Sequence, residues 1–217
     1  MEDYVDVNKN SHNDIAHEYV ERHKTRGINE PNYDEYWNLI MKHVDYNTNL
    51  KVLELGPGQG LMLKYMEEQK VRTMAIELSD KMLELAKKES PNTFYIDDDI
   101  RNVNLHNNQF DIIFAGSFVH LFQKDDLNLV MNKICSWLKK DGALFFYTTI
   151  HEKDEEDFFE KSDYKSSVKR YRRKFTKDSF EKLLLDHNLE TLEFFTREEP
   201  ERNKNWQFYL CRKYANK

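Results

Sequence analysis

The stretch VLELGPGQG, residues 52–60, places three glycines within five positions of a 217-residue chain that has only 6 glycines in total. The apolar run at residues 51–55 is typical of a buried strand, and the pattern from about residue 59 to residue 70 indicates a helix after the glycines. Glycine lets the backbone turn sharply and lets a ligand approach it closely. The N-terminus of the following helix adds N–H groups that have no partner within the helix. The stretch therefore predicts a strand, a ligand-binding loop and a helix.

Segments typical of strands and helices alternate along the chain. The predicted strands span residues 51–55, 72–78, 93–96, 110–115, 143–150, 189–195 and 206–211. Strands that alternate with helices indicate a parallel sheet covered on both faces, which is an open, doubly wound α/β fold. No helical pattern separates the last two strands, so we expect an antiparallel hairpin at the edge of a mostly parallel, seven-stranded sheet. Two further helical patterns, at about residues 14–23 and 32–44, precede the first strand.

Charge and cysteine content exclude several classes of protein. The chain has 33 Lys and Arg against 39 Asp and Glu, a net charge of −6, which argues against a nonspecific nucleic-acid binder. Cys135 and Cys211 are too few for a disulfide framework, and no His/Cys/Asp spacing suggests a metal site. The polar N-terminus does not resemble a signal peptide, and no apolar run approaches the roughly 18 residues of a membrane span. We expect a soluble, cytoplasmic protein without nucleic-acid or membrane partners.

The spacing of the glycines separates two classes of nucleotide ligand. A dinucleotide fingerprint has the pattern G-x-G-x-x-G, whereas here Gly60 comes one residue early and Leu61 follows it. This spacing favours a nucleoside-type ligand without a pyrophosphate. Glu54, inside the strand, would be unfavourable beside phosphates and would suit a ligand with an ammonium group. A nicotinamide-dependent oxidoreductase of the same architecture remains the alternative.

Two more carboxylates follow predicted strands. Glu77 ends the second strand 21 residues after Gly56, where a carboxylate can accept hydrogen bonds from both hydroxyls of a ribose. The alternative is a solvated glutamate at a strand end. Asp99 follows the third strand, where it could accept from an adenine amino group with Ile100 against the ring. Its alternative role is that of a helix cap or a loop residue.

The chain resembles the class I S-adenosylmethionine-dependent methyltransferases, which have a Rossmann-like fold. The resemblance rests on VLELGPGQG (52–60), AIELSDKMLELAKK (75–88), DIRNVNLHNNQFDIIFAGSFVHLF (99–122), ICSWLKKDGALFFYTT (134–149) and, more loosely, FTKDSFEKLLLDHNLETLEFF (175–195). It implies S-adenosylmethionine as cofactor and in-line transfer of its methyl group. The segment after the fourth strand lacks the Asn-Pro-Pro-Tyr-like tetrapeptide that base-modifying relatives often carry, which argues against a nucleic-acid acceptor. We expect a small-molecule acceptor, and a protein or peptide acceptor remains the alternative.

The resemblance also implies a role for each part of the site. Residues 54–60 would hold the methionine part of the cofactor, Glu77 the ribose, and residues 115–118 would face the sulfonium. The first helices resemble the variable lid of small-molecule methyltransferases, so we expect a lid at residues 1–48 and a cofactor-binding domain at 49–217 in one globular unit. The residues expected around the cofactor are Tyr19, Glu54, Gly56, Gly58, Gln59, Gly60, Glu77, Leu78, Met82, Asp99, Ile100, Ala115, Gly116, Ser117 and Phe118.

Methyl transfer depends mainly on alignment in a dry site and needs a general base only when the acceptor must lose a proton. His120, after the fourth strand, is the better candidate base, with side-chain packing as the alternative role. His151, after the fifth strand, is the second candidate, with a solvated loop position as its alternative. A non-catalytic protein that binds the cofactor would show the same sequence features.

Residues 151–175 are acidic at first and basic later. A solvated, charged helix is the default interpretation of such a pattern. In the family that the chain resembles, this position often carries substrate-binding elements. The sequence therefore supports the hypothesis that residues 169–173, Lys-Arg-Tyr-Arg-Arg, contact an anionic substrate.

Overall fold

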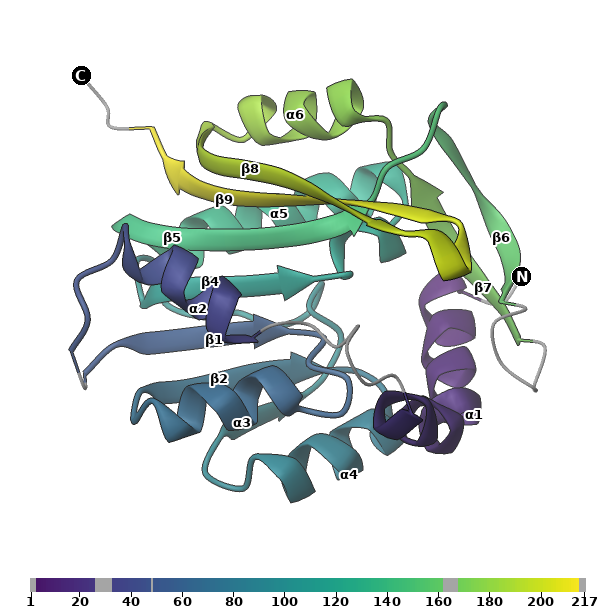
Figure 1. Cartoon of the computed structure of the whole chain (residues 1–217), viewed down its shortest axis with the longest axis horizontal. Coiled ribbons are helices and arrows are strands. Elements are labelled where there is room, and N and C mark those ends of the chain that lie inside the picture. Colours follow the sequence, from purple (N-terminus) through teal and green to yellow (C-terminus); the bar gives the residue numbers. More distant parts are fainter. Residues whose placement is uncertain (1–2, 26–32, 48, 162–167, 215–217) are drawn as a thin grey trace.

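A mixed seven-stranded sheet forms the centre of the computed structural model, which describes residues 3–25, 33–47, 49–161 and 168–214 (Figure 1). Its strands are β1 (Lys51–Leu55), β2 (Arg72–Glu77), β3 (Phe94–Asp97), β4 (Phe110–Gly116), β5 (Leu138–Thr149), β8 (Leu189–Glu199) and β9 (Lys204–Lys213), in the order β3-β2-β1-β4-β5-β9-β8. Strands β1 to β5 pair in parallel, whereas β9 pairs antiparallel with both β5 and β8. The predicted fold class, including the antiparallel edge hairpin, is confirmed.

Helices cover both faces of this sheet (Figure 1). They are α2 (Tyr33–Met41), α3 (Leu61–Glu68), α4 (Asp80–Glu89), α5 (Lys124–Trp137) and α6 (Lys177–Asp186). A further helix, α1 (Tyr4–Thr25), lies across the carboxyl ends of the parallel strands. Leu53 and Ile113 belong to the core on which α5 and α6 pack, and their neighbours Val52 and Ile112 belong to the core under α2 and α3. All four side chains are fully buried. Because successive strand residues point to opposite faces, burial of both faces requires the continuous apolar runs seen in the sequence.

The N-terminal helix starts earlier than its sequence pattern predicts. Helix α1 begins at Tyr4, ten residues before the expected start at residue 14. Its first turn is buried through Tyr4 and Val5, which pack against Tyr171 from a distant part of the chain. The stretch between them and Ile15 is polar apart from Val7, so its helical face could not be recognised from apolar spacing alone. Helix α2 ends at Met41, before the predicted end at residue 44.

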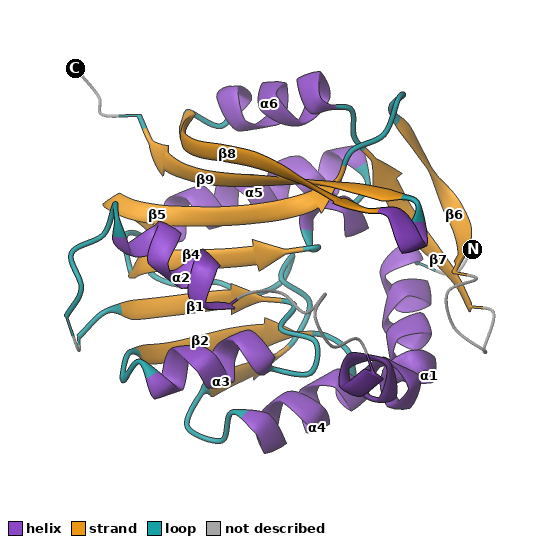
Figure 2. Ribbon diagram, in the orientation of Figure 1, coloured by secondary structure: helices purple, strands orange, loops and turns teal. Residues whose placement is uncertain are grey.

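The expectation of a charged helix in residues 151–175 is wrong. This segment contains β6 (Glu155–Lys161) and β7 (Val168–Lys174), an antiparallel pair separate from the large sheet (Figure 2). Acidic residues of β6 face basic residues of β7: Glu156 lies opposite Arg173 and Glu155 opposite Lys174, with O–N distances of 3.0 and 2.8 Å. Opposite charges on facing strands stabilise the pairing. These partners are 17 and 19 positions apart, beyond the spacing that a helical pattern tests.

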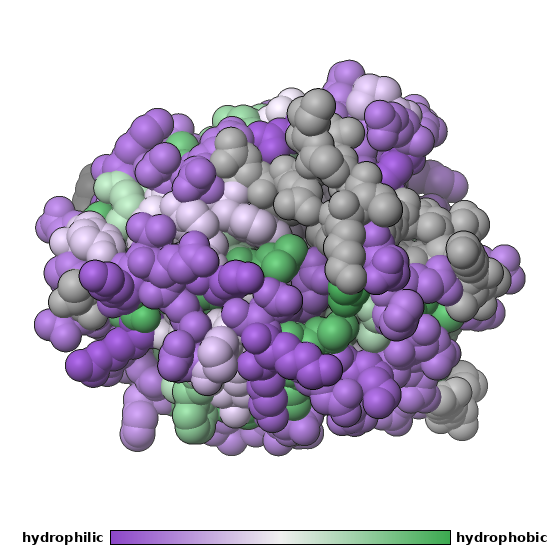
Figure 3. Space-filling model, turned by 60° about the horizontal axis from the view of Figure 1, so that its bottom comes forward, coloured by the Kyte–Doolittle hydropathy of each residue, from purple (hydrophilic) through white to green (hydrophobic). Residues whose placement is uncertain are grey.

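The surface is strongly polar. Most of the face drawn in Figure 3 is hydrophilic, as expected of a chain in which 33% of the residues are charged.

Cys135 and Cys211 are free thiols. Within the described parts of the chain, no helix combines the length and apolar character that crossing a membrane requires.

Candidate functional site

A cavity of about 640 Å³ lies where the parallel strands end. Helix α1 faces this edge of the sheet (Figure 1). The cavity is lined by the loops after β1, β2, β3 and β4, by α1 and α2, by β7 and by the β8–β9 hairpin. Of the predicted cofactor residues, it is lined by Tyr19, Glu54, Gly56, Gly58, Gln59, Glu77, Leu78, Met82, Asp99, Ile100, Gly116, Ser117 and Phe118. The chain thus brings together at one cavity most of the residues that the sequence suggests.

Glycines of the loop after β1 have different surroundings. Gly58 has a φ of +57°, and a Cβ added there would meet nothing closer than Tyr19 at 3.8 Å. Gly60 has a φ of +82°, and its Cβ would lie 2.8 Å from the Cα of Ala86 in α4. Both conformations favour glycine. Gly58 therefore leaves open backbone at the cavity, whereas Gly60 allows the start of α3 to pack closely on α4.

The segment after β4 turns sharply beside the glycine loop, residues 56–60, which follows β1. Ser117 has a φ of +53°, and its N–H donates to the Tyr147 carbonyl over 2.8 Å. The ring of Phe118 then lies against the glycine loop, since a Cβ added to Gly56 would be 2.9 Å from Phe118 Cδ2. Gly56 is therefore needed for the close approach of the two loops that border the cavity.

Glu77, at the end of β2, accepts hydrogen bonds that hold the glycine loop in place. Its Oε1 accepts from the Ser79 N–H over 2.8 Å, and its Oε2 accepts from the Gly58 N–H over 3.4 Å. Burial raises the pKa of this carboxyl to about 7, although the backbone hydrogen bonds act in the opposite direction. The carboxyl therefore titrates close to neutral pH and still has acceptor capacity toward the cavity.

Glu54 is a buried carboxyl with an unsatisfied oxygen. Its side chain lines the cavity, and Oε2 has no hydrogen-bond partner among the described residues. Burial, together with the nearby charge of Glu77, raises the pKa of Glu54 well above its usual value. A buried polar atom without a partner is costly. A cationic or hydrogen-bond-donating group of a ligand would remove that cost.

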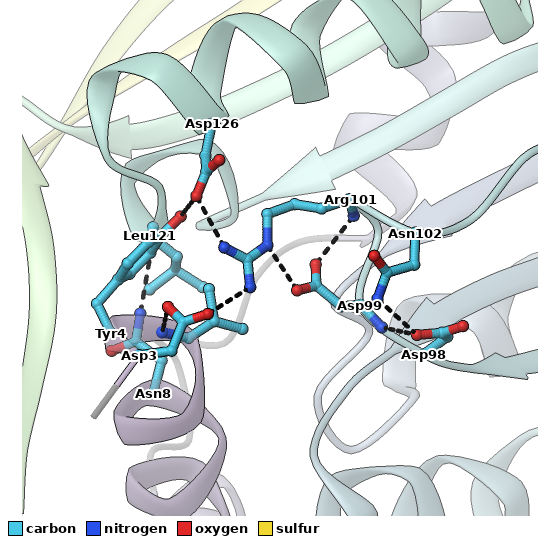
Figure 4. Close-up of polar contacts among 10 residues, drawn as sticks. Asp3, Tyr4, Asn8, Asp98, Asp99, Arg101, Asn102, Leu121 and Asp126 are labelled. Carbon is cyan, nitrogen blue, oxygen red and sulfur yellow. Dashed lines mark hydrogen bonds and ion pairs between the residues drawn. The ribbon is translucent and has the colours of Figure 1, made fainter. Parts of the chain in front are cut away.

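Asp99 is held in place by a neighbour that sequence reasoning missed. Its Oδ1 accepts from the Arg101 N–H over 2.9 Å and its Oδ2 accepts from Arg101 Nε over 2.6 Å (Figure 4). The same guanidinium donates to Asp126 and to Asp3, each over 2.9 Å. Arg101 thus fixes the orientation of Asp99 and joins the loop after β3 to α5 and to the N-terminus of the chain.

Helix α1 is also bonded directly to the wall of the cavity. Tyr4 donates to Asp126 Oδ2 over 2.5 Å, and Asn8 Nδ2 donates to the Leu121 carbonyl over 3.3 Å (Figure 4). Farther along the helix, Asn13 accepts from the hydroxyl of Ser79 over 2.7 Å. These contacts hold α1 across the ends of the strands.

Only one of the two candidate bases lies at the cavity. His120, in the short 3-10 helix η2 (Val119–Leu121), is 3% exposed and lines the cavity, with Nδ1 3.3 Å from Thr148 Oγ1. His151 is not among the residues that line the cavity. Its Nε2 is 2.8 Å from Thr149 Oγ1, and its backbone N–H donates to the Phe175 carbonyl. Burial, with the charges of Arg172 and Lys174, lowers the pKa of His151 to about 4. His151 is therefore neutral at physiological pH.

Two predicted cofactor residues, Ala115 and Gly60, also lie outside the cavity lining. The side chain of Ala115 is fully buried in the core beneath α5 and α6.

Within the described ranges, no group of three or more His, Cys, Asp or Glu side chains has the arrangement of a metal site.

The part of the cavity nearest β5 and the β8–β9 hairpin is aromatic and basic. Its aromatic lining comprises Tyr33, Tyr36, Phe114, Tyr147, Trp206 and Phe208, and its basic lining comprises Arg170, Arg172, Arg197, Arg202 and Lys204. Of the five residues in the predicted anion-binding segment, only Arg170 and Arg172 line the cavity. Sequence reasoning missed the contribution of the edge hairpin, because a hairpin that is polar at its tip gives no sign of which strand ends it will reach.

Known proteins are similar in sequence to the central part of this chain. Residues 53–146 match the sequence profile of a family described as a methyltransferase domain. An uncharacterised methyltransferase of Oceanobacillus iheyensis is 27% identical over 121 residues, which cover 56% of this chain and 57% of that protein. The malonyl-(acyl-carrier protein) O-methyltransferase of Acetivibrio thermocellus is 29% identical over 136 residues, 57% of this chain and 47% of that protein. The chain spans about half the length of these curated relatives.

Among solved structures, the 1,6-didemethyltoxoflavin-N1-methyltransferase of Burkholderia thailandensis has the same fold, with a TM-score of 0.76. The match covers 98% of this chain and 89% of that one at 16% sequence identity. That structure holds 1,6-didemethyltoxoflavin and S-adenosylhomocysteine. The likeness extends over the N-terminal helices and the edge hairpin as well as the central sheet.

Proposed function

We propose, from the match of residues 53–146 to a methyltransferase-domain family, that this chain is a class I S-adenosylmethionine-dependent methyltransferase that transfers the methyl group of its cofactor to a small-molecule acceptor. The observation that carries the proposal is the meeting of Gly58, Glu54 and Glu77 at one end of the cavity. Open backbone at Gly58 leaves room for a ligand, and the two buried carboxyls offer acceptors for an ammonium group and for hydroxyls. The methionine and ribose parts of the cofactor present those groups.

Each part of the cofactor has a proposed partner in the cavity. Glu54 would bind the ammonium group and Glu77 the ribose hydroxyls. Asp99, oriented by Arg101, would accept from the adenine amino group, with the buried side chain of Ile100 against the ring. A pyrophosphate beside Glu54 would be repelled, which favours this cofactor over a nicotinamide dinucleotide.

When bound, S-adenosylmethionine supplies a methyl group on a positively charged sulfur, and the charge disappears as the methyl group is transferred. The residues of the chain contribute binding and alignment of the two reactants in a cavity that has aromatic rings in part of its wall. His120 is the proposed general base for acceptors that must lose a proton, since it is buried and lines the cavity.

Helix α1 is the proposed lid over the cofactor. Its hydrogen bonds support this role, because they connect the helix to Leu121 and Ser79 of the cavity wall and to Asp126 of α5. The ring of Tyr19 lies beside Gly58, which supports its proposed contact with the cofactor. The two free thiols fit a reducing compartment, so cytoplasmic location remains part of the proposal.

Cofactor affinity is expected to depend on pH through Glu77. Its pKa of about 7 means that the carboxyl is partly protonated at neutral pH, whereas acceptance from two ribose hydroxyls requires the ionised form. Binding below pH 7 must then release a proton, so affinity should rise with pH by up to about tenfold per unit and level off above pH 7. 5′-Methylthioadenosine, which has no group that titrates between pH 6 and 8.5, is the probe for this calorimetric series. A Glu77→Gln variant should give a flat profile, and a flat wild-type profile would refute the assignment.

The proposed activity is tested by transfer of labelled methyl groups. Purified protein is incubated with S-adenosylmethionine labelled in its methyl group and with the small-molecule fraction of a cell extract. We expect label in a small-molecule product together with one S-adenosylhomocysteine for each methyl group transferred. A Glu77→Ala variant serves as the matched control and should leave the product unlabelled. Cofactor binding without any labelled product would support the alternative, a non-catalytic binding protein.

A further inference from the structure

Acidic and basic side chains that line the cavity are distributed unevenly around it. Of the acidic lining residues, Glu54 lies in β1, Glu77 ends β2, and Asp98 and Asp99 directly follow β3. Three basic residues, Arg197, Arg202 and Lys204, come from the β8–β9 hairpin, on the other side of β4 in the strand order. Arg170 and Arg172 come from β7 of the separate two-stranded sheet, and Lys9 comes from α1. Arg172 reaches β5, where it donates to the hydroxyl of Thr149. The proposed cofactor site therefore occupies the acidic half, and the basic half borders the space left for an acceptor.

Basic side chains outnumber acidic ones in that second half. Five basic residues line it, against the three glutamates Glu35, Glu198 and Glu199. The lining residues described there thus carry two more positive than negative charges. The low pKa of His151, which arises from burial and then from the charges of Arg172 and Lys174, agrees with a positive potential in this region.

Successive side chains of β7 point to opposite sides of the strand, and one of these sides lines the cavity. Arg170 and Arg172 are two positions apart and line it together. Tyr171 points the other way, is 3% exposed and packs on Tyr4 with ring centroids 4.8 Å apart. Arg173 also lies on that side and pairs with Glu156 over 3.0 Å. The strand therefore presents two guanidinium groups to the cavity and uses its other face for structure.

The guanidinium groups of the edge hairpin are held in position by protein contacts. Arg197 Nη2 is 2.7 Å from Glu35 Oε2, and its Cζ lies 5.9 and 5.6 Å from the ring centroids of Tyr36 and Phe208. Arg202 Nη1 is 3.2 Å from Glu199 Oε1. Side chains fixed in this way lose little further freedom when a ligand arrives.

We propose that the methyl acceptor is a planar aromatic carboxylic acid, whose carboxylate is bound by Arg170 and Arg172 and whose ring lies among the aromatic residues of the cavity. This inference rests on the methyltransferase function proposed above. A planar guanidinium group matches a carboxylate by donating two hydrogen bonds at once. The rings of Tyr36, Phe114, Tyr147, Trp206 and Phe208 provide apolar walls for a flat body.

The test compares acids with their uncharged amides on protein saturated with S-adenosylhomocysteine. Benzoate, salicylate and 4-hydroxybenzoate are each titrated by calorimetry beside the corresponding amide. We expect at least one acid to bind at least tenfold more tightly than its amide. The double variant Arg170→Gln, Arg172→Gln should weaken binding of that acid tenfold or more, with unchanged affinity for S-adenosylhomocysteine. Arg173→Gln, on the opposite side of β7, is the matched control and should bind the acid as wild type does.

Failure of this inference differs from failure of the proposed function. If S-adenosylhomocysteine does not bind, the proposed function itself is wrong. If it binds but no acid exceeds its amide, the cavity does not select an aromatic carboxylate. Equal acid affinity in the double variant and the wild type would likewise overturn the assignment of Arg170 and Arg172. Preserved S-adenosylhomocysteine binding shows in each case that the variant is folded.

Discussion

Glu77→Ala is expected to lower the affinity for S-adenosylhomocysteine by at least a hundredfold. The substitution removes the proposed acceptor of two ribose hydroxyls, and each hydrogen bond to a charged group contributes about 1.5–3 kcal/mol. It also removes the acceptor that holds the N–H groups of Gly58 and Ser79, so the glycine loop loses its support from β2. Calorimetric titration of the purified variant measures the change directly.

The matched control is a second glutamate close to α4, the helix that follows Glu77 in the chain. Glu89, at the end of α4, pairs with Lys64 on the surface over 3.0 Å, and neither residue lines the cavity. Glu89→Ala should bind S-adenosylhomocysteine as wild type does. A folded Glu77→Ala protein, judged by circular dichroism, whose affinity stays within about threefold of wild type would show that Glu77 does not bind the ribose.

Gly60→Ala is expected to destabilise the fold, whereas Gly58→Ala should mainly weaken ligand binding. A Cβ at Gly60 would lie 2.8 Å from the backbone of Ala86, at a φ of +82°. Overpacking and the left-handed conformation together should cost about 3 kcal/mol of unfolding free energy. At Gly58 the nearest atom is 3.8 Å away, so the cost there is only the conformational one, about 1–2 kcal/mol.

Two measurements on the same pair of variants separate these effects. Urea denaturation should show a clearly lower midpoint for Gly60→Ala than for Gly58→Ala. Titration with S-adenosylhomocysteine should show the larger loss of affinity for Gly58→Ala, because its added methyl group projects into the space proposed for the ligand. The reverse order in both measurements would mean that the two glycines have been assigned the wrong roles.

The central sheet could be predicted because its signals are local. Each buried strand, such as residues 51–55, is an apolar run, and the helix over residues 124–137 shows its apolar spacing within one segment. Strand β7 has no such signal. The carboxylates that stabilise β7 belong to its partner strand β6, which is a separate segment of the sequence. The buried Tyr171 of β7 packs on Tyr4, which lies 167 positions earlier in the chain.

The candidate site was predictable in its cofactor half for a similar reason. Glu54 and Glu77 are in or at the end of parallel strands, and the carboxyl ends of such strands meet at one edge of a sheet. Arg101 could not be assigned from sequence, because its partners Asp3 and Asp126 come from distant segments. The basic half of the cavity is assembled from β7 and the edge hairpin, so its residues become neighbours only when the chain is folded.

The central claim is that this cavity binds S-adenosylmethionine. Its most direct test is calorimetric titration of the wild-type protein with S-adenosylhomocysteine and, under the same conditions, with NAD. We predict binding of S-adenosylhomocysteine at one site per chain and no binding of NAD. Binding of NAD without binding of S-adenosylhomocysteine would contradict the account and would favour the oxidoreductase alternative.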